Sequence, residues 1–165
     1  MSRILIGIDP GFADMGYGVI ETGAAGDRCL DYGSIVTRVG TDRAGRLKAV
    51  YDGLAKIIVE QRPVEAAVER LFFSKNVRTA IAVAEARGVI LLCLADHGVP
   101  VREFSPQEVK LAVCGHGAAD KRQVQRMVQT LLGLEELPKP DDAADALALS
   151  IALAHTMVYP VPKKI

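Results

Sequence analysis

The chain has few cysteines, few aromatic residues, no tryptophan and no long apolar run, and each shortage excludes a class of protein. Three cysteines among 165 residues are too few for a disulfide framework, and none has the spacing of a zinc site. We therefore expect Cys29, Cys93 and Cys114 to be reduced thiols that fill space as small apolar groups. No apolar stretch approaches the roughly 18 residues of a membrane span, and the N-terminal stretch is too short for a signal peptide. These shortages predict a cytoplasmic protein without membrane contact.

An excess of charge of either sign is also missing. Twenty Lys and Arg residues balance twenty Asp and Glu residues, which excludes an overall cationic coat for nucleic acid but allows a local basic face. Because 50% of the residues are hydrophobic and 24% are charged, a packed core is expected and general disorder is excluded. The length suits one domain. We expect it over residues 1–157, followed by a flexible tail over residues 158–165 that contains two prolines.

The order of apolar patterns predicts an α/β protein. Strands are expected over residues 3–8, 16–21, 30–38, 64–69 and 100–104. Apolar residues at three- and four-residue steps predict helices over residues 42–62, 75–97, 105–113, 121–132 and 141–156. The expected N-terminal caps are Thr41 or Asp42, Ser74 and Asp120. Three successive strands, followed by alternating helices and strands, predict a mixed five-stranded sheet whose first three strands are antiparallel and whose faces are both covered by helices.

Three carboxylates stand where a charge is costly. Asp9 and Glu69 each end an apolar strand, and Asp145 interrupts a helix that is otherwise apolar over residues 143–149. A lone buried carboxylate costs several kcal/mol unless it is paired or binds a metal. No Lys or Arg lies within one helical turn of Asp145, so its own helix offers it no counter-charge. These positions indicate a site rather than a solvated surface.

A fourth acid, Asp142, lies three residues before Asp145 and therefore on the same helix face, whereas Asp141 is out of phase and should point elsewhere. Convergence of the four acids at one end of the sheet would create a repulsion that a cation must relieve. Carboxylate oxygens suit Mg²⁺, for which Mn²⁺ can substitute. Two such ions about 3.5–4 Å apart hydrolyse phosphodiesters. The alternative is that Glu69 and Asp142 are exposed and that Asp9 only caps a turn.

Six motifs follow one another over about residues 2–156: Gly7-Ile8-Asp9-Pro10-Gly11 with Gly16-Tyr17-Gly18, Val68-Glu69-Arg70-Leu71-Phe72, Ala86-Arg87-Gly88-Val89, Gln107-Glu108-Val109-Lys110, the run from Asp120 to Val128, and Asp142-Ala143-Ala144-Asp145-Ala146-Leu147-Ala148. In these motifs, their order and their spacing, the chain resembles the RuvC family of Holliday-junction resolvases, within the RNase H-like nuclease superfamily. The resemblance covers nearly the whole chain.

The resemblance implies an RNase H-like fold and a homodimer that resolves four-way DNA junctions by paired symmetric nicks. It implies a Mg²⁺-dependent endonuclease of recombination and repair, which leaves 5′-phosphate and 3′-hydroxyl ends and works with the RuvA–RuvB branch-migration machinery. It assigns the acidic catalytic and metal-binding roles to Asp9, Glu69, Asp142 and Asp145. It also places Lys110 and Lys121 near the scissile phosphate and Phe72 against junction bases.

Contacts with DNA are expected from aromatic and basic side chains. Phe72 or Phe73 would stack on an unpaired base, and the other would pack in the core or in a dimer interface. Lys121 would neutralise charge on the phosphorane, or it is a plain surface lysine. A basic rim is expected from Arg70, Lys75, Arg78, Lys110, Lys121, Arg122 and Arg126.

A strip of small residues marks the long second helix. Ala80, Ala84 and Gly88 recur at four-residue steps, which suits a close approach by the same helix of a second copy or, alternatively, burial against the sheet of its own chain. An isologous dimer would match the two-fold symmetry of a junction. The three histidines, His97, His116 and His155, are interpreted as structural or exposed.

Three other functions remain open from the residues. The turn Asp9-Pro10-Gly11 with Gly16 and Gly18 also suits a phosphate loop of an actin-like or sugar-kinase ATPase, although a second such turn is missing. An RNase H-like nuclease that cuts RNA–DNA hybrids is a second alternative. A junction-binding module without catalysis is a third, although all four acids are present.

Overall fold

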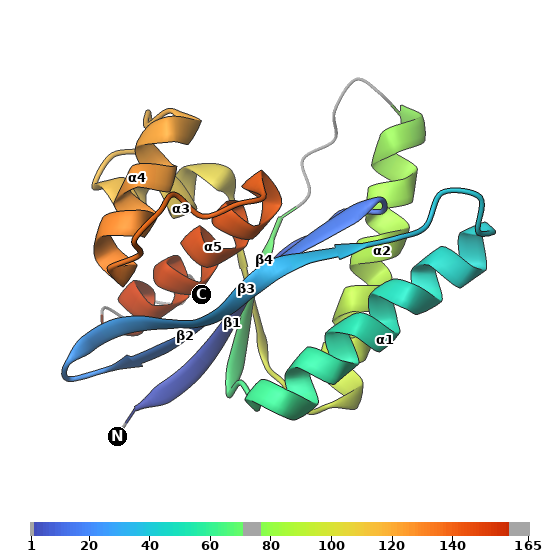
Figure 1. Cartoon of the computed structure of the whole chain (residues 1–165), viewed down its shortest axis with the longest axis horizontal. Coiled ribbons are helices and arrows are strands. Elements are labelled where there is room, and N and C mark those ends of the chain that lie inside the picture. Colours follow the sequence, from blue (N-terminus) through green and yellow to red (C-terminus); the bar gives the residue numbers. More distant parts are fainter. Residues whose placement is uncertain (1, 71–76, 159–165) are drawn as a thin grey trace, which may run out of the picture.

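A five-stranded mixed sheet forms the centre of the molecule in the computed structural model, which describes residues 2–70 and 77–158 (Figure 1). The strands are β1 (Arg3–Asp9), β2 (Asp14–Gly23), β3 (Gly26–Val36), β4 (Glu65–Glu69) and β5 (Val101–Phe104), in the spatial order β3-β2-β1-β4-β5. The first three strands are antiparallel, and β4 and β5 continue the sheet parallel to β1. The predicted sheet is therefore confirmed.

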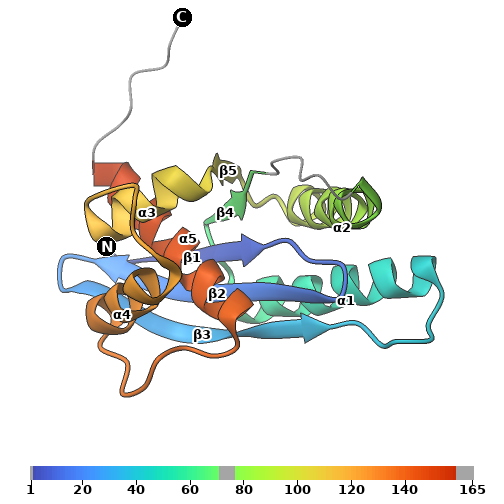
Figure 2. The same ribbon diagram turned by 90° about the horizontal axis from the view of Figure 1, so that it is seen from above.

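Helices cover both faces of this sheet, as Figures 1 and 2 show. One face carries α1 (Arg43–Gln61) and α2 (Val77–Asp96), and the other carries α3 (Pro106–Cys114), α4 (Lys121–Leu132) and α5 (Asp141–Val158). Adjacent residues of β1 separate the two cores because side chains alternate across a strand. Leu5 packs with the α3–α5 layer, whereas Ile6 and Ile8 pack with α1 and α2. Among the described helices, none is long and apolar enough to cross a membrane.

Local sequence signals set most helix ends. The side chain of Asp42 accepts a hydrogen bond from the Gly45 amide at the start of α1, and Asp120 forms a reciprocal capping box with Gln123 at the start of α4. Gly133 ends α4 in the left-handed conformation that glycine adopts without strain. Both predicted caps are confirmed. The expected cap Ser74 and residues 159–165 of the expected tail lie outside the described residues.

The β2–β3 hairpin is longer than the apolar pattern predicts. It extends from Asp14 to Val36 around a two-residue turn, because backbone pairing continues from Thr22↔Asp27 to Gly23↔Gly26. The polar end residues of this hairpin satisfy the hydrogen-bonding ladder without contributing to the core. Apolar spacing therefore underestimates the two strands at the turn.

Close contact between α5 and the sheet positions the end of that helix. A Cβ atom on Gly16 would lie 2.1 Å from the carbonyl oxygen of Asp142, and one on Gly7 would lie 2.0 Å from that of Ala146. The buried hydroxyl of Ser150 donates a hydrogen bond of 2.7 Å to the Gly18 carbonyl. Because the strands carry only hydrogen at these points, the α5 backbone lies directly on β1 and β2.

Candidate active site

Asp9 and Glu69 lie side by side because their strands are parallel neighbours. Ile8 pairs with Val68 in the β1–β4 register, so the next residue in each strand is the acid at its C-terminal end. Helix α5 begins at the same edge, where Gly16, the β2 partner of Asp9, meets the backbone of Asp142. Three segments that are distant in the sequence thus bring their acids to one place.

Three of the acids form a tight group. The carboxylates of Asp9, Asp142 and Asp145 each offer an oxygen, and these oxygens lie within 4.8 Å of one another. All three side chains are half-buried. Glu69 is outside this tightest group, but its charge acts on Asp9, and it lines a cavity together with Asp145. The alternative that Glu69 and Asp142 are fully exposed is wrong, because both are partly buried.

Burial and mutual repulsion disturb the ionisation of these acids. Burial, followed by the charges of Glu69, Asp145 and Asp142, raises the pKa of Asp9 from its ordinary value of 3.8 to about 8. Burial is also the main cause that raises the pKa of each of the other three acids, with the charge of Asp145 adding to the effect at Glu69 and that of Asp14 at Asp142. The raised pKa values show that the carboxylates have too little positive charge nearby to offset their burial and mutual repulsion. These hard oxygen donors therefore fit a divalent cation such as Mg²⁺.

Lys121 supplies the counter-charge that the sequence of α5 does not contain. From α4, its Nζ atom lies 3.4 Å from Asp145 Oδ2 and 3.1 Å from Asp141 Oδ2. Asp141 is exposed and outside the tight carboxylate group, as expected, although it shares this lysine with Asp145. Burial lowers the pKa of Lys121, but the hydrogen bond to Asp141 and the charge of Asp145 raise it overall.

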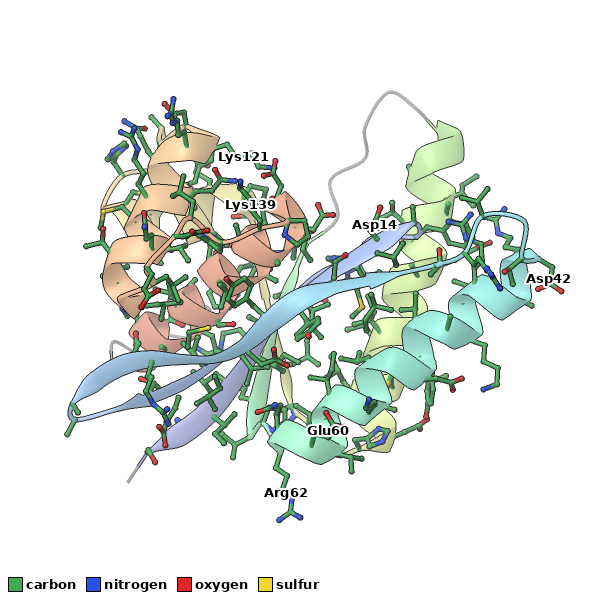
Figure 3. The ribbon with its side chains drawn as sticks, viewed as in Figure 1. Asp14, Asp42, Glu60, Arg62, Lys121 and Lys139 are labelled. Carbon is green, nitrogen blue, oxygen red and sulfur yellow. The ribbon has the colours of Figure 1, made fainter. Side chains whose placement is uncertain are left out.

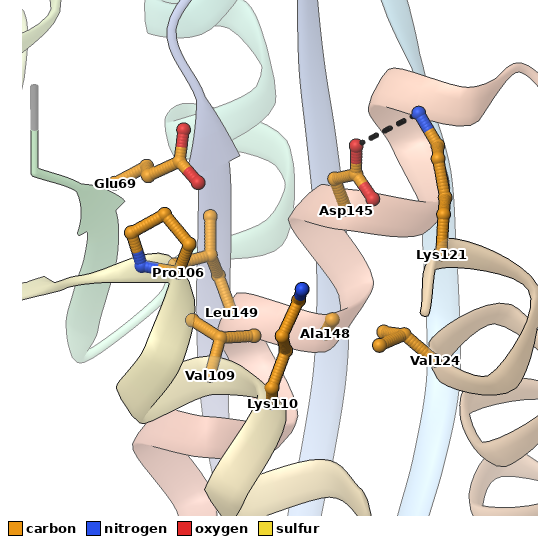
Figure 4. Close-up of a pocket in the computed structure, with 9 residues that line it drawn as sticks. All are labelled: Glu69, Pro106, Val109, Lys110, Lys121, Val124, Asp145, Ala148 and Leu149. Carbon is orange, nitrogen blue, oxygen red and sulfur yellow. Dashed lines mark ion pairs between the residues drawn. The ribbon is translucent and has the colours of Figure 1, made fainter. Parts of the chain in front are cut away.

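A cavity of about 210 Å³ opens beside Asp145. Figure 4 shows Glu69 on one side and Asp145 with Lys121 on the other, while Lys110 of α3 extends between them. Apolar side chains, including Val109 and Leu149, form the rest of the wall. Two lysines that face two acids provide a place where a phosphate group and cations can be held together.

The other predicted DNA contacts have different surroundings. Arg70 is 3.9 Å from Glu103 and 3.9 Å from Glu108, so its charge is shared within the protein. Arg122 and Arg126 are exposed on α4. Phe72, Phe73 and Lys75 lie outside the described residues, and the side chain of Arg78 is likewise not described.

Arg87 belongs to one of the six motifs, but no role for it follows from the sequence alone. The Nε atom of Arg87 donates a hydrogen bond of 3.4 Å to the backbone carbonyl of Glu69, and its guanidinium forms an ion pair with Glu103. It therefore links α2 to the ends of β4 and β5 and fixes the backbone under a site acid. Its place next to Gly88 gives no sign of this contact, because the partner is a carbonyl group.

The cysteines and histidines lie as expected for structural residues. Cys93 is buried, Cys29 and Cys114 are half-buried, and all three are free thiols. His97 donates from Nδ1 to the Cys93 carbonyl at 2.7 Å, and His155 lies between the Ala112 carbonyl and Asp27. The third histidine, His116, is exposed.

Comparison with known proteins identifies the family. Residues 5–155 match the family model described as crossover junction endodeoxyribonuclease RuvC. This chain belongs to the RuvC family. A RuvC from Moorella thermoacetica is 54% identical over 95% of this chain and 93% of its own length, and one from Heliobacterium modesticaldum is 50% identical over 96% and 98%. The actin-like ATPase alternative is thereby excluded.

Solved structures of the RuvC family agree with the fold. RuvC of Thermus thermophilus in complex with a Holliday junction substrate superimposes with a TM-score of 0.89 at 35% identity, covering 94% of each chain. The yeast mitochondrial Holliday junction resolvase Ydc2, at 11% identity and a TM-score of 0.69, shares the fold. The predicted RNase H-like architecture of a RuvC protein is thus confirmed.

Proposed function

We propose that this chain is a structure-selective endonuclease that resolves four-way DNA junctions by paired symmetric nicks during recombination and repair. The observation that carries the proposal is the convergence of Asp9, Asp142 and Asp145, with Glu69 in electrostatic range, in a chain of the RuvC family. The related Thermus protein, whose structure contains a Holliday junction substrate, supports the same DNA for this chain. An RNA–DNA hybrid nuclease has no such support.

Mg²⁺ would be held by the four acids, as two ions in each active site, and Mn²⁺ would substitute. The fit rests on three carboxylate oxygens within 4.8 Å of one another and on the raised pKa of Asp9. When bound, the ions supply an activated water and stabilise the 3′ oxygen that leaves. Asp9 and Glu69 would contribute their carboxylates from the C-terminal ends of β1 and β4, and Asp142 and Asp145 would contribute theirs from the start of α5.

The lysines act on the phosphate. Lys121 Nζ lies 3.1 Å from Asp141 and 3.4 Å from Asp145, at the edge of the carboxylate group, where its ammonium group would face the negative charge that develops on the phosphorane. Lys110, on the same cavity, binds a non-bridging oxygen. The expected products carry a 5′ phosphate and a 3′ hydroxyl. Phe72 or Phe73 would stack on a junction base.

A homodimer formed through α2 completes the proposal. Ala84 and Gly88 are exposed, and a Cβ atom on Gly88 would meet nothing within 4 Å. Ile81 and Leu92, on the same helix, are 51% and 56% exposed. This apolar strip does not pack on its own sheet, which supports its use against a second copy. Two active sites related by a two-fold axis would then meet two symmetric strands.

The wider setting is inferred from the family. We place the nuclease domain at residues 1–157, its action in the bacterial cytoplasm and its branch-migration partners in the RuvA–RuvB complex. The curated relatives described above are bacterial. A pull-down with purified RuvA and RuvB on junction DNA measures the partnership, and loss of a ternary complex would contradict it.

A synthetic mobile four-way junction, incubated with the protein and Mg²⁺, tests the function directly. We expect paired nicks at symmetric positions, with linear duplex and RNA–DNA hybrid left intact. Asp9→Asn should reduce cutting by at least about 1,000-fold, because it removes an anionic ligand, while junction binding in a gel-shift assay persists. Cutting by this variant at the parental rate, or preferential cutting of the hybrid, would contradict the proposal.

A further inference from the structure

A second groove reaches the acidic site from the side opposite to the lysine cavity. Its volume is about 460 Å³, and it is lined by Gly11, Phe12, Ala13, Asp14, Arg46, Ala82, Val83 and Asp142. We call it the Arg46 groove. Asp142 lines this groove and Asp145 lines the lysine cavity, so the carboxylate group stands between the two. In Figure 3, Lys121 lies on the side of α4 and α5, and Asp14 lies on the side of α2.

Arg46 is held in place before any ligand arrives. Its guanidinium carbon lies 4.2 Å from the centre of the Phe12 ring, and its Nε donates a hydrogen bond of 2.8 Å to Thr37 Oγ1. The same buried hydroxyl donates 2.8 Å to the carbonyl of Phe12. Arg46, Thr37 and Phe12 therefore form a closed set of contacts that joins α1, the end of β3 and the β1–β2 turn. A cation–π contact of this kind is worth about 0.5–1 kcal/mol at exposed sites.

No carboxylate neutralises the charge of Arg46 within the described part of the chain. Residues 2–70 and 77–158 place no carboxylate within ion-pair distance of it, whereas its neighbour Arg43 pairs with Glu85. An arginine has five N–H donors, and Thr37 accepts from one of them. The remaining donors belong to a flat, fixed cation in a groove, which is the arrangement that suits a phosphate group.

Two carboxylates also line the groove and bear on which ligand it holds. Asp142 belongs to the proposed metal site, so its charge is committed when cations are bound. Asp14 is exposed to solvent, where salt and water screen its repulsion of a phosphate. A cation held between these two acids is the competing occupant of the groove. In that case Arg46 would weaken the binding of the ligand in the groove instead of strengthening it.

We propose that Arg46 binds a non-scissile phosphate of the DNA strand that is cut, close to the scissile phosphate and on the Asp142 side of the carboxylates. The proposal rests on the proposed function. A strand laid across the acids continues on both sides, because its phosphates repeat about every 3.4 Å of helix axis. The lysine cavity serves one side, and the Arg46 groove serves the other. The groove thus fixes the direction and register of the strand.

Junction binding by Arg46→Gln tests the charge. In Ca²⁺, we expect the Kd to rise about tenfold, as for loss of one charge-assisted hydrogen-bonded contact. The slope of log affinity against log salt should become shallower by about 0.9, the value for one phosphate. Arg46→Lys should fall between the two proteins, because it keeps the charge without the planar fork. Lys56→Gln is the matched control: it removes one positive charge from an exposed position of the same helix and should change neither quantity.

Neutral methylphosphonate groups, placed one at a time around the cut site, locate the phosphate. We expect one flanking position at which the substitution weakens binding by the wild-type protein but has no further effect on Arg46→Gln. Effects that add at every position, an unchanged salt slope, or tighter binding by Arg46→Gln would overturn the proposal. Thermal unfolding of each variant checks that the fold is kept, and Arg46→Lys provides the comparison if Arg46→Gln is unstable.

Junction cutting by the wild-type protein distinguishes a failure of the Arg46 proposal from a failure of the proposed function. If the wild-type protein cuts junctions in pairs while Arg46→Gln binds and cuts equally well, only the phosphate subsite is wrong. If it does not cut junctions at all, the proposed function fails and the subsite fails with it.

Discussion

Asp9 is the residue whose ionisation the fold changes most. Burial and then the neighbouring acids raise its pKa from the ordinary value of 3.8 to about 8. Between these values Asp9 holds more of its proton in the folded protein than in the unfolded chain, so its contribution to the free energy of unfolding falls as pH rises from about 4 to about 8 and then levels off. The folded state thus tolerates the acid best when it is protonated, and divalent cations must compete with that proton.

Asp9→Asn should therefore stabilise the cation-free protein at pH 8, by an amount on the order of a few kcal/mol, and should reduce the fall of Tm between pH 5 and pH 8. Mg²⁺ should raise the Tm of the wild-type protein more at pH 8 than at pH 6. Thermal unfolding in EDTA and in Mg²⁺ measures both effects. Equal profiles of Tm against pH for the two proteins would show that the pKa of Asp9 is not raised in the folded protein.

Lys121 should affect the rate of cutting more than DNA binding. Lys121→Gln removes the only ammonium group that contacts Asp145 among the described residues, and we expect single-turnover cutting to fall about 100-fold with a change in junction Kd below about threefold. Arg122→Gln, on the next residue of the same helix, should weaken binding without such a loss of rate. A loss of affinity in Lys121→Gln that accounts for the whole loss of cutting would contradict a catalytic role.

At the scale of elements, the contact between α5 and β2 fixes the site. Gly16→Ala would place a Cβ atom 2.1 Å from the Asp142 carbonyl, so α5 must move away from the strand ends. We expect a loss of about 1–3 kcal/mol in unfolding free energy. The loss of cutting rate, expressed as an activation free energy, should be larger than this loss of stability. Gly23→Ala, on the same strand, is the control, because its Cβ would meet its nearest atom at an ordinary 3.5 Å. Equal activity of the two variants would contradict this account.

The elements and the caps at two helix starts follow from local sequence, whereas most contacts between elements do not. Asp42 and Asp120 mark helix starts through bonds to their own chain three residues on, so spacing alone predicts them. The meeting of Asp9 with Asp145 was predictable because a buried acid demands a partner or a cation. Lys121 with Asp145, and Arg46 on Phe12, depend on how helices pack on the sheet. No local pattern encodes that packing.

At the scale of the whole molecule, the described part of α2 carries an apolar strip that its own sheet leaves uncovered. Leu92→Glu should place a charge in the proposed dimer interface, convert the dimer to a monomer in sedimentation at micromolar concentration, and replace paired nicks by independent single nicks. Val59→Glu, at an exposed apolar residue of α1, is the control. A wild-type protein that sediments as a monomer would contradict dimerisation through α2.

The bare backbone beneath α5 limits how this chemistry can be moved to another protein. Grafting the four acids onto a different α/β sheet would leave the helix one side-chain layer too far from the strands, because Gly7, Gly16 and Gly18 allow the close approach here. A design that transplants the active site must therefore reproduce the strand glycines beneath the helix as well as the four acids.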